Sequence, residues 1–235
     1  MGYFDVELMA RFPEQKSVLR HYITVDQKPL GRNGALKRTM DLVASLCAIV
    51  FLLPLFAIVA VGIKLTSKGP VLFKQKRLGK YGRHYSIYKF RTMHLDGDDK
   101  LQSLLASCPI SRENWNKYQK LENDPRITRL GSFLRRSSID ELPQLINVVR
   151  GEMSLVGHRP ILPEQKAMYG KDNILHYIRS RPGLTGLWQI SGRNSLPFER
   201  RAELDVEYSK RWSFLLDLKI LVKTIPALLF ADGAY

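Results

Sequence analysis

The chain has 235 residues, 45% of them apolar, and a formal net charge of +15 at pH 7. This composition supports a packed core and excludes global disorder, while the length fits one domain with or without a membrane attachment. The positive charge predicts an anionic partner, such as nucleic acid, anionic lipid or a phosphorylated substrate. Its two cysteines, Cys47 and Cys108, match neither a disulfide framework nor a metal-binding spacing, so we expect the bulk of the chain to be cytoplasmic.

An uncharged apolar run extends from Leu42 to Ile63. As one straight helix it would reach roughly 33 Å, enough to cross a bilayer core. Basic residues flank the run on both sides, so a single crossing would place one basic flank outside, against the positive-inside tendency. Pro54, near the middle, removes a backbone donor and predicts a break. We therefore favour a re-entrant hairpin with both flanks on the cytoplasmic face; the alternative is a kinked transmembrane helix.

The segment Lys68–Met93 alternates glycine-containing turns with short β-prone stretches. If its last part is extended, the period of two places Lys89 and Arg91 on one face, where two cations can hold a diphosphate. A solvated basic strand edge is the alternative. The acidic stretch 94–100 does not match a calcium-binding loop, and we expect a solvated turn there.

Helices are expected over 101–121, with a break near Pro109, and over the basic stretch 126–136. A further helix is expected to begin near the adjacent carboxylates of Asp140 and Glu141 and to end at Arg150-Gly151.

The proline at position 143 decides between two starts for this helix. With Ser138 as N-cap, Pro143 would fall where a backbone donor is needed, whereas with Asp140 as N-cap it falls in the first turn. We prefer the second register. It places both carboxylates at the positive end of a helix dipole, which also suits a bound phosphate.

Two later stretches, 151–160 and 181–194, are rich in glycine and arginine. Arg159, Arg181 and Arg193 stand there beside glycine or proline. Glycine lets the backbone approach a ligand and arginine binds phosphate through two hydrogen bonds, so we interpret these stretches as phosphate-binding loops rather than plain turns. Neither a P-loop nor a dinucleotide-binding fingerprint occurs.

The C-terminal stretch Trp212–Phe230 is apolar but carries Asp217, Lys219 and Lys223. These charges make it too polar to cross a membrane easily. The pattern predicts an amphipathic helix at the membrane interface, with a core helix as the alternative.

A carboxylate pair near cations suits phosphoryl transfer with a divalent metal. In such chemistry the metal and the arginines neutralise the phosphate oxygens, and a carboxylate can attack phosphorus. The sequence therefore indicates a membrane enzyme acting on a phosphorylated substrate.

Four segments carry a resemblance to a known family: KRTMDLV, YKFRTM, DPRITRLGSFLRRSSIDELPQLINVVRGEMSLVGHRP and RPGLTGLWQISGRN. They are similar to the bacterial sugar transferases, the monotopic polyprenyl-phosphate phosphoglycosyl transferases, over about residues 36–235. The resemblance implies an α/β (α+β) fold, a helix-rich monotopic enzyme with a re-entrant hairpin, short strands and interfacial amphipathic helices. The expected organisation is an extension over 1–35, a membrane-embedded segment over 36–67 and a cytoplasmic catalytic domain over 68–235.

The activity implied by the resemblance is transfer of a hexose 1-phosphate from a UDP-sugar to undecaprenyl phosphate, with release of UMP. This step begins exopolysaccharide synthesis at the cytoplasmic face of the bacterial inner membrane. Galactose is the preferred hexose, with glucose next. The expected partners are the UDP-sugar, undecaprenyl phosphate and inner-membrane lipids, with no nucleic acid, and a homo-oligomer stays open.

Residue roles follow by position. Asp140 matches the family's nucleophile, and Glu141 matches the partner that helps to hold Mg2+. The positions expected to bind substrate are Lys89, Arg91, Arg135, Arg159, Arg181, Gln189 and Arg193. The chain departs from the family pattern at two positions. Leu53 replaces the serine that commonly precedes the hairpin proline, and His158 replaces the first proline of a Pro-Arg-Pro motif.

Two other classes of protein fit the sequence less well. A nucleic-acid-binding protein would explain the charge of +15 but not the long uncharged run, and no recognition motif is present. A catalytically silent membrane scaffold would explain the run but not the carboxylate pair and the arginine-rich loops.

Overall fold

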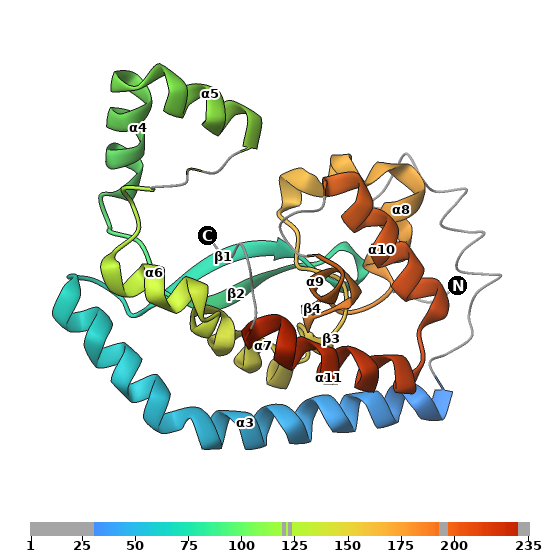
Figure 1. The fold of residues 1–235 in the computed structure, drawn as a ribbon. Coiled ribbons are helices and arrows are strands. Elements are labelled where there is room, and N and C mark those ends of the chain that lie inside the picture. The colour runs from blue at the N-terminus through green and yellow to red at the C-terminus, as the bar shows by residue number, and fades with distance from the viewer. Residues whose placement is uncertain (1–30, 119–120, 122–123, 193–196, 230–235) are drawn as a thin grey trace.

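The computed structural model describes residues 31–118, 121, 124–192 and 197–229. The predicted extension over 1–35 lies almost wholly outside this range. Figure 1 shows a long first helix beneath a body of shorter helices and two small sheets, with a helical arm, α4 and α5, projecting from the body. The prediction of a helix-rich protein with short strands is confirmed.

The regular elements are as follows. The strands are β1 (Leu72–Leu78), β2 (His84–Phe90), β3 (Ser154–Val156) and β4 (Gly183–Thr185). The α-helices are α3 (Gly31–Thr66), α4 (Gly97–Ser107), α5 (Pro109–Tyr118), α6 (Arg129–Arg136), α7 (Leu145–Arg150), α8 (Gly170–Ile178), α9 (Leu187–Ile190), α10 (Phe198–Arg211) and α11 (Phe214–Leu229). Short 3-10 helices are η2 (Lys80–Gly82), η3 (Ile139–Gln144) and η4 (Pro163–Tyr169).

α3 is the one helix in the described ranges that is long and apolar enough to cross a membrane. Pro54 lies inside it without ending it, and the helix is bowed along the underside of the body (Figure 1). A proline can bend a helix without terminating it when the flanking turns stay packed. The hairpin of two separate arms expected at Pro54 is therefore not shown.

Both ends of α3 are attached to the same body. Near its start, Arg38 donates hydrogen bonds to two backbone carbonyls of α7, at 2.7 and 2.9 Å. Asp41 accepts hydrogen bonds from the Ser154 hydroxyl at 2.8 Å and from the Leu155 N–H at 3.0 Å. Near its end, Ile63 is buried in a cluster with residues of β2 and α6. The helix therefore lies along the body rather than leading away from it.

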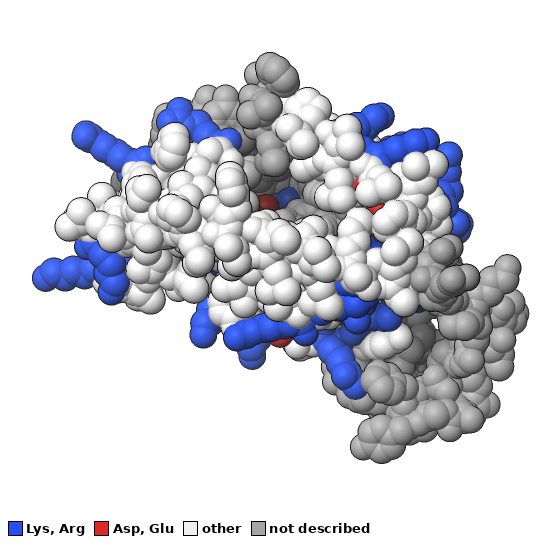
Figure 2. Space-filling view, turned by 90° about the horizontal axis from the view of Figure 1, so that it is seen from below, with Lys and Arg blue, Asp and Glu red and all other residues white. Residues whose placement is uncertain are grey.

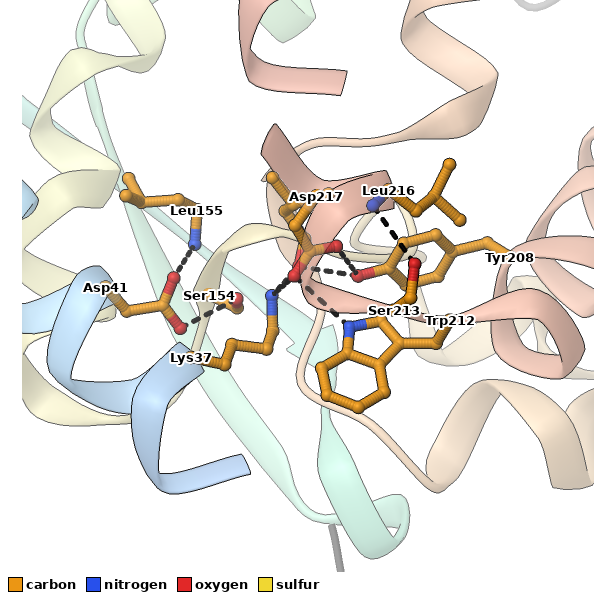
Figure 3. Close-up of polar contacts among 10 residues, drawn as sticks. Lys37, Asp41, Ser154, Leu155, Tyr208, Trp212, Ser213, Leu216 and Asp217 are labelled. Carbon is orange, nitrogen blue, oxygen red and sulfur yellow. Dashed lines mark hydrogen bonds and ion pairs between the residues drawn. The ribbon is translucent and has the colours of Figure 1, made fainter. Parts of the chain in front are cut away.

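A buried ion pair joins α3 to α11 (Figure 3). The fully buried carboxylate of Asp217 accepts hydrogen bonds from Lys37 Nζ at 2.5 Å, Tyr208 OH at 2.7 Å and Trp212 Nε1 at 3.2 Å. Lys37 also donates to the backbone carbonyl of Val156 at 2.9 Å. A buried carboxylate is tolerated only when it is paired and hydrogen-bonded. These contacts, which we call the Asp217 clamp, therefore require α3 and α11 to lie side by side.

The strands predicted within Lys68–Met93 form an antiparallel hairpin, with Leu72 opposite Phe90 and Leu78 opposite His84. Its connection turns through left-handed backbone, because both Tyr81 (φ 58°) and Gly82 (φ 68°) have positive φ. The second sheet is the parallel pair β3–β4, formed by the two glycine-rich stretches. The predicted helix break near Pro109 is confirmed as the boundary between α4 and α5.

The preferred N-cap at Asp140 is wrong. η3 begins after Ser138, which has left-handed backbone (φ 55°) and makes no side-chain capping bond. The α-helix α7 starts only at Leu145, beyond Pro143, because a short 3-10 turn tolerates a proline that an α-helical interior does not. The predicted end is confirmed, since Gly151 follows α7 with φ 80°.

The underside of the molecule is an uncharged surface. α11 exposes an apolar ridge that consists of Leu215, Leu218, Val222 and Ile225. Exposed apolar residues of α3 lie on the same side of the body, and Figure 2 shows this face nearly free of charge, with lysines and arginines around its edge. An apolar surface of this kind with a basic border is typical of contact with a membrane. The helix expected near the C-terminus is present as α11, and its place at a membrane interface stays a prediction.

Replacing the buried carboxylate should cost far more stability than replacing an exposed one. We expect Asp217→Ala to lower the free energy of unfolding by about 3–5 kcal/mol, because the partly buried Lys37 loses its partner and the hydrogen bonds of Tyr208 and Trp212 are lost as well. Glu207→Gln, which breaks an exposed pair with Arg211, should cost less than about 1 kcal/mol. Urea unfolding of the detergent-solubilised protein measures both. Equal losses would contradict the role of the clamp.

Candidate active site

The two adjacent carboxylates meet a lysine from the hairpin. η3 packs beside β2, and this places Lys89 Nζ 2.6 Å from Glu141 Oε1. Asp140 is buried, with only 8% of its surface exposed. We call Asp140 and Glu141 the dyad. The structure thus brings together the predicted catalytic pair and one of the predicted substrate-binding cations.

The carboxylate of Asp140 is weakly solvated because the residue is buried. Burial raises the pKa of Asp140 to about 6, and the negative charge of Glu141 also raises it. The positive charges of Lys89 and Arg135 act in the opposite direction. No described side chain donates a hydrogen bond to the Asp140 oxygens. The one hydrogen bond that lowers its pKa comes from its own backbone, so ionised Asp140 has no side-chain donor and little hydration to lose.

Glu141 has the opposite electrostatics. Burial disfavours its charge, but the positive charges of Lys89, Arg159 and Arg77 outweigh burial and lower its pKa to about 2. Glu141 therefore stays ionised at neutral pH and is held by Lys89. The dyad divides into one permanently charged carboxylate and one that titrates near neutrality.

The dyad lines a cavity of about 1080 Å3. The predicted residues that share this cavity are Lys89, Arg91, Arg135, Asp140, Glu141, Arg159 and Gln189. Figure 2 shows a hollow in the uncharged underside with acidic and basic atoms inside it. A volume of this size is enough for a nucleotide-sized ligand. An anionic ligand is favoured because cations outnumber carboxylates among the lining residues.

Arg91 and Arg135 contribute unequally to the cavity. The guanidinium of Arg91 donates to the backbone carbonyls of Ser67 and Lys68, at 2.9 and 2.6 Å. Arg135 keeps more of its donors, since only its Nε is engaged, with Thr92 Oγ1 at 2.9 Å. Lys89 and Arg91 therefore do not form the predicted diphosphate-binding pair in this structure, because Arg91 is hydrogen-bonded to the backbone that follows α3.

Trp188 was not singled out from the sequence, yet it organises one wall of the cavity. The guanidinium carbon of Arg159 lies 4.4 Å from its ring centroid and that of Arg201 lies 4.9 Å away. The indole N–H of Trp188 and the side-chain carbonyl of Gln189 are buried without hydrogen-bond partners. Buried polar groups are normally paired, so these two atoms are exceptions among the residues that line the cavity.

Three predicted or noted positions lie elsewhere. Arg181 donates from Nε to the Gly151 carbonyl at 2.7 Å and does not line the cavity. Arg193 lies outside the described residues. His158 points into the core, stacked on Tyr177, and burial lowers its pKa to about 4, so it is neutral. His158 therefore supports the loop before Arg159 from beneath and does not contact the cavity.

A second buried acid lies behind this loop. Asp205 of α10 accepts a hydrogen bond from Tyr169 OH at 2.5 Å and one from the Arg159 backbone N–H. Burial raises its pKa to about 7, although these hydrogen bonds and nearby arginines lower it. The sequence gives no local signal for this contact, because Arg159, Tyr169 and Asp205 come from three separate segments of the chain.

The dyad is the candidate position for Mg2+. Among the described residues no three His, Cys, Asp or Glu side chains gather closely enough to hold a metal by themselves. Mg2+ is commonly bound by one or two carboxylates, with water and substrate phosphates completing its shell. Asp140, which has no described side-chain donor, lies beside Glu141 and fits that mode. Mg2+ stays a prediction tied to the phosphorylated substrate.

Comparison with known proteins gives consistent matches. The family model described as bacterial sugar transferase matches residues 32–231. The exopolysaccharide production protein ExoY of Sinorhizobium fredii is 44% identical over 208 residues, covering 88% of this chain and 91% of the relative. The undecaprenyl-phosphate galactose phosphotransferase of Salmonella typhimurium is 44% identical over 201 residues, 85% of this chain and 42% of the relative. The undecaprenyl-phosphate glucose phosphotransferase of Komagataeibacter xylinus is 43% identical over 225 residues, 90% of this chain and 39% of the relative.

The buried acid should make stability depend on pH. With a pKa of about 7 when folded and about 3.9 when unfolded, Asp205 keeps a proton in the folded chain that the unfolded chain has lost. Its contribution to the free energy of unfolding therefore falls by on the order of a few kcal/mol as pH rises from about 4 to about 7. Asp205→Asn should flatten this fall in urea unfolding measured across that range. An unchanged slope would show that Asp205 does not titrate as a buried acid.

Proposed function

The chain belongs to the bacterial sugar transferase family, and on that basis we propose that it moves a hexose 1-phosphate from a UDP-sugar to undecaprenyl phosphate. It is thus a transferase acting at the first step of exopolysaccharide synthesis. Relatives named for galactose and for glucose support these two hexoses, and we propose galactose first.

The observation that carries the proposal is the unequal dyad in a cationic cavity. Asp140 is a buried carboxylate without a side-chain hydrogen-bond donor among the described residues, and Glu141 beside it is held ionised by Lys89. A nucleophile for phosphorus must be ionised, weakly solvated and surrounded by groups that neutralise the phosphate. Asp140 meets these requirements better than any other described carboxylate lining the cavity, since Asp98 is exposed.

The proposed reaction has two steps. An Asp140 oxygen attacks the sugar-bearing phosphorus of the UDP-sugar, and the bond to the bridging oxygen breaks. UMP leaves with that oxygen, and a sugar phosphate remains bound to the Asp140 carboxylate. A phosphate oxygen of undecaprenyl phosphate then attacks the same phosphorus and displaces Asp140, which forms undecaprenyl diphospho-sugar. The acceptor phosphate is already anionic, so the second step needs no strong base.

The cations of the cavity have roles in both steps. Lys89 holds Glu141 and lies close to the reacting phosphate, while Arg135 and Arg159 stabilise negative charge on the phosphate oxygens. Arg159 is itself supported by the Trp188 ring. Mg2+, when held by Asp140 and Glu141, would supply further neutralisation of the phosphate charge.

The enzyme is proposed to act at the cytoplasmic face of the inner membrane, with α3 embedded but not crossing. Attachment of both ends of α3 to one body supports this, because a crossing helix would carry one end to the far side. The basic residues on both flanks support it as well. Re-entry would then follow from the bow of α3 rather than from two separate arms.

Loss of the proposed nucleophile should stop the first step. We expect Asp140→Asn to lower turnover by at least about 10^3-fold, because an amide cannot form the covalent phosphosugar. Without the lipid, wild-type protein should release UMP once per active site and the variant none. Asp99→Asn, an exposed carboxylate of α4 outside the cavity, is the matched control and should behave as wild type. Full turnover by Asp140→Asn, or release of UDP, would disprove the mechanism.

The orientation of α3 can be tested by cysteine labelling. In a protein with Cys47 and Cys108 replaced by serine, single cysteines are placed at the exposed positions Thr39 and Thr66, near the two ends of α3. A membrane-impermeant maleimide should label both in inside-out vesicles and neither in right-side-out vesicles. Labelling of one end from each side would show that α3 crosses the membrane.

A further inference from the structure

One wall of the cavity is not needed for a nucleotide sugar. Besides the dyad and the arginines, the cavity is lined by Leu221, Thr224 and Ile225 of α11 and by Phe73 of β1. Phe73 and Ile225 are exposed at 49% and 61%. A UDP-sugar has no aliphatic chain to place against such side chains. We call Leu221, Ile225 and Phe73 the apolar wall.

The wall meets the outward ridge of α11 at Ile225, which belongs to both. Leu221 and Ile225 are four residues apart, so they lie on one face of the helix and both reach the cavity. Val222 is exposed at 68% but does not line the cavity. α11 thus directs Leu221 toward the cavity and Val222 outward, with Ile225 at the border between the two.

Thr224, the polar residue of α11 beside the apolar wall, is already hydrogen-bonded within the protein. The Thr224 hydroxyl contacts the Thr185 hydroxyl at 2.7 Å and donates to the Ile220 carbonyl at 2.7 Å. Because the hydroxyl is engaged with these partners, what α11 offers the cavity is chiefly hydrocarbon. An apolar ligand chain could bury this surface without leaving a polar group unpaired.

The wall is held in position by the Asp217 clamp. Asp217 lies one helical turn before Leu221 and is fixed by Lys37, Tyr208 and Trp212 (Figure 3). The clamp therefore sets the rotation of α11 about its axis, which decides which residues face the cavity. Exposed apolar side chains are thereby kept beside the charged dyad at a defined place.

We propose that the apolar wall binds the first isoprene units of the carrier lipid, while the phosphate of the same lipid lies at the dyad. The inference rests on the proposed function and adds a subsite to it. Only the acceptor combines a phosphate with a long hydrocarbon chain. Such a molecule reaches the dyad from the uncharged underside, where Figure 2 shows the hollow with charged atoms inside it. The wall therefore acts in the second step and not in the first.

The test separates the two steps. Leu221→Ala and Ile225→Ala are made singly and together, with Val222→Ala as the matched control on the same helix. Release of UMP without lipid measures the first step and counts folded active sites. Steady-state turnover against undecaprenyl phosphate in detergent micelles measures the second.

The double variant should keep a full first-turnover release of UMP and raise the KM for undecaprenyl phosphate by about tenfold or more, because hydrocarbon contacts are lost. Val222→Ala should change neither. An unchanged KM in the double variant would overturn the subsite, as would an equal rise in Val222→Ala, which would indicate a general effect on membrane seating. If Leu221→Ala lowered the first-step release through misfolding, the exposed Ile225→Ala would decide alone.

The same design distinguishes failure of the subsite from failure of the proposed function. If wild-type protein released no UMP from any UDP-sugar, the proposed reaction itself would be wrong. If wild-type protein released UMP once per site but the wall variants bound the lipid normally, only the subsite would be wrong.

Discussion

The buried carboxylate of Asp217 constrains the whole arrangement of helices. Removing this charge from water is tolerable only because Lys37, from the other end of the chain, meets it together with two ring donors. Neighbours of Lys37 continue the attachment, since Arg38 contacts α7 and Asp41 contacts β3. The charged residues that open the apolar helix therefore anchor it to the body, and the uncharged underside exists because α3 and α11 are held there together.

The chemistry depends on making two adjacent carboxylates unlike each other. Glu141 is paired with Lys89 and stays charged, whereas Asp140 is buried without a described side-chain donor and has a pKa raised to about 6. A hairpin strand and a 3-10 turn, which come from different parts of the chain, produce this difference by their packing. The same cavity continues to the apolar side of α11, so charge and hydrocarbon meet in one place. A reaction that joins a water-soluble donor to a lipid acceptor requires such a place.

Much of the fold could be predicted because its causes are local. The uncharged run, the alternation that forms the hairpin, the proline that begins α5 and the glycine after α7 each act within a few residues. The dyad and the arginine-rich stretches were recognised for the same reason: they are short patterns. Five of the predicted binding residues line the cavity, namely Lys89, Arg91, Arg135, Arg159 and Gln189. Lys89 also contacts the dyad directly, through Glu141.

The sequence by itself thus indicated the long apolar helix, the hairpin and the candidate dyad, because periodicity and turn chemistry depend on neighbouring residues. It did not indicate that α4 begins at Gly97, within the expected turn over 94–100, or that the two glycine-rich stretches pair as β3 and β4. Only the tertiary structure decided what each charge contacts. Arg91 and Arg181 share the residue type of Arg159, yet Arg91 donates through Nη1 and Nη2 to backbone carbonyls, and Arg181 donates through Nε to the Gly151 carbonyl and does not line the cavity. Asp217, expected to be a polar residue of an interfacial helix, is the buried partner of a lysine 180 residues away. Local pattern cannot specify such partners, since the contact free energy depends on segments that meet only when the chain has folded.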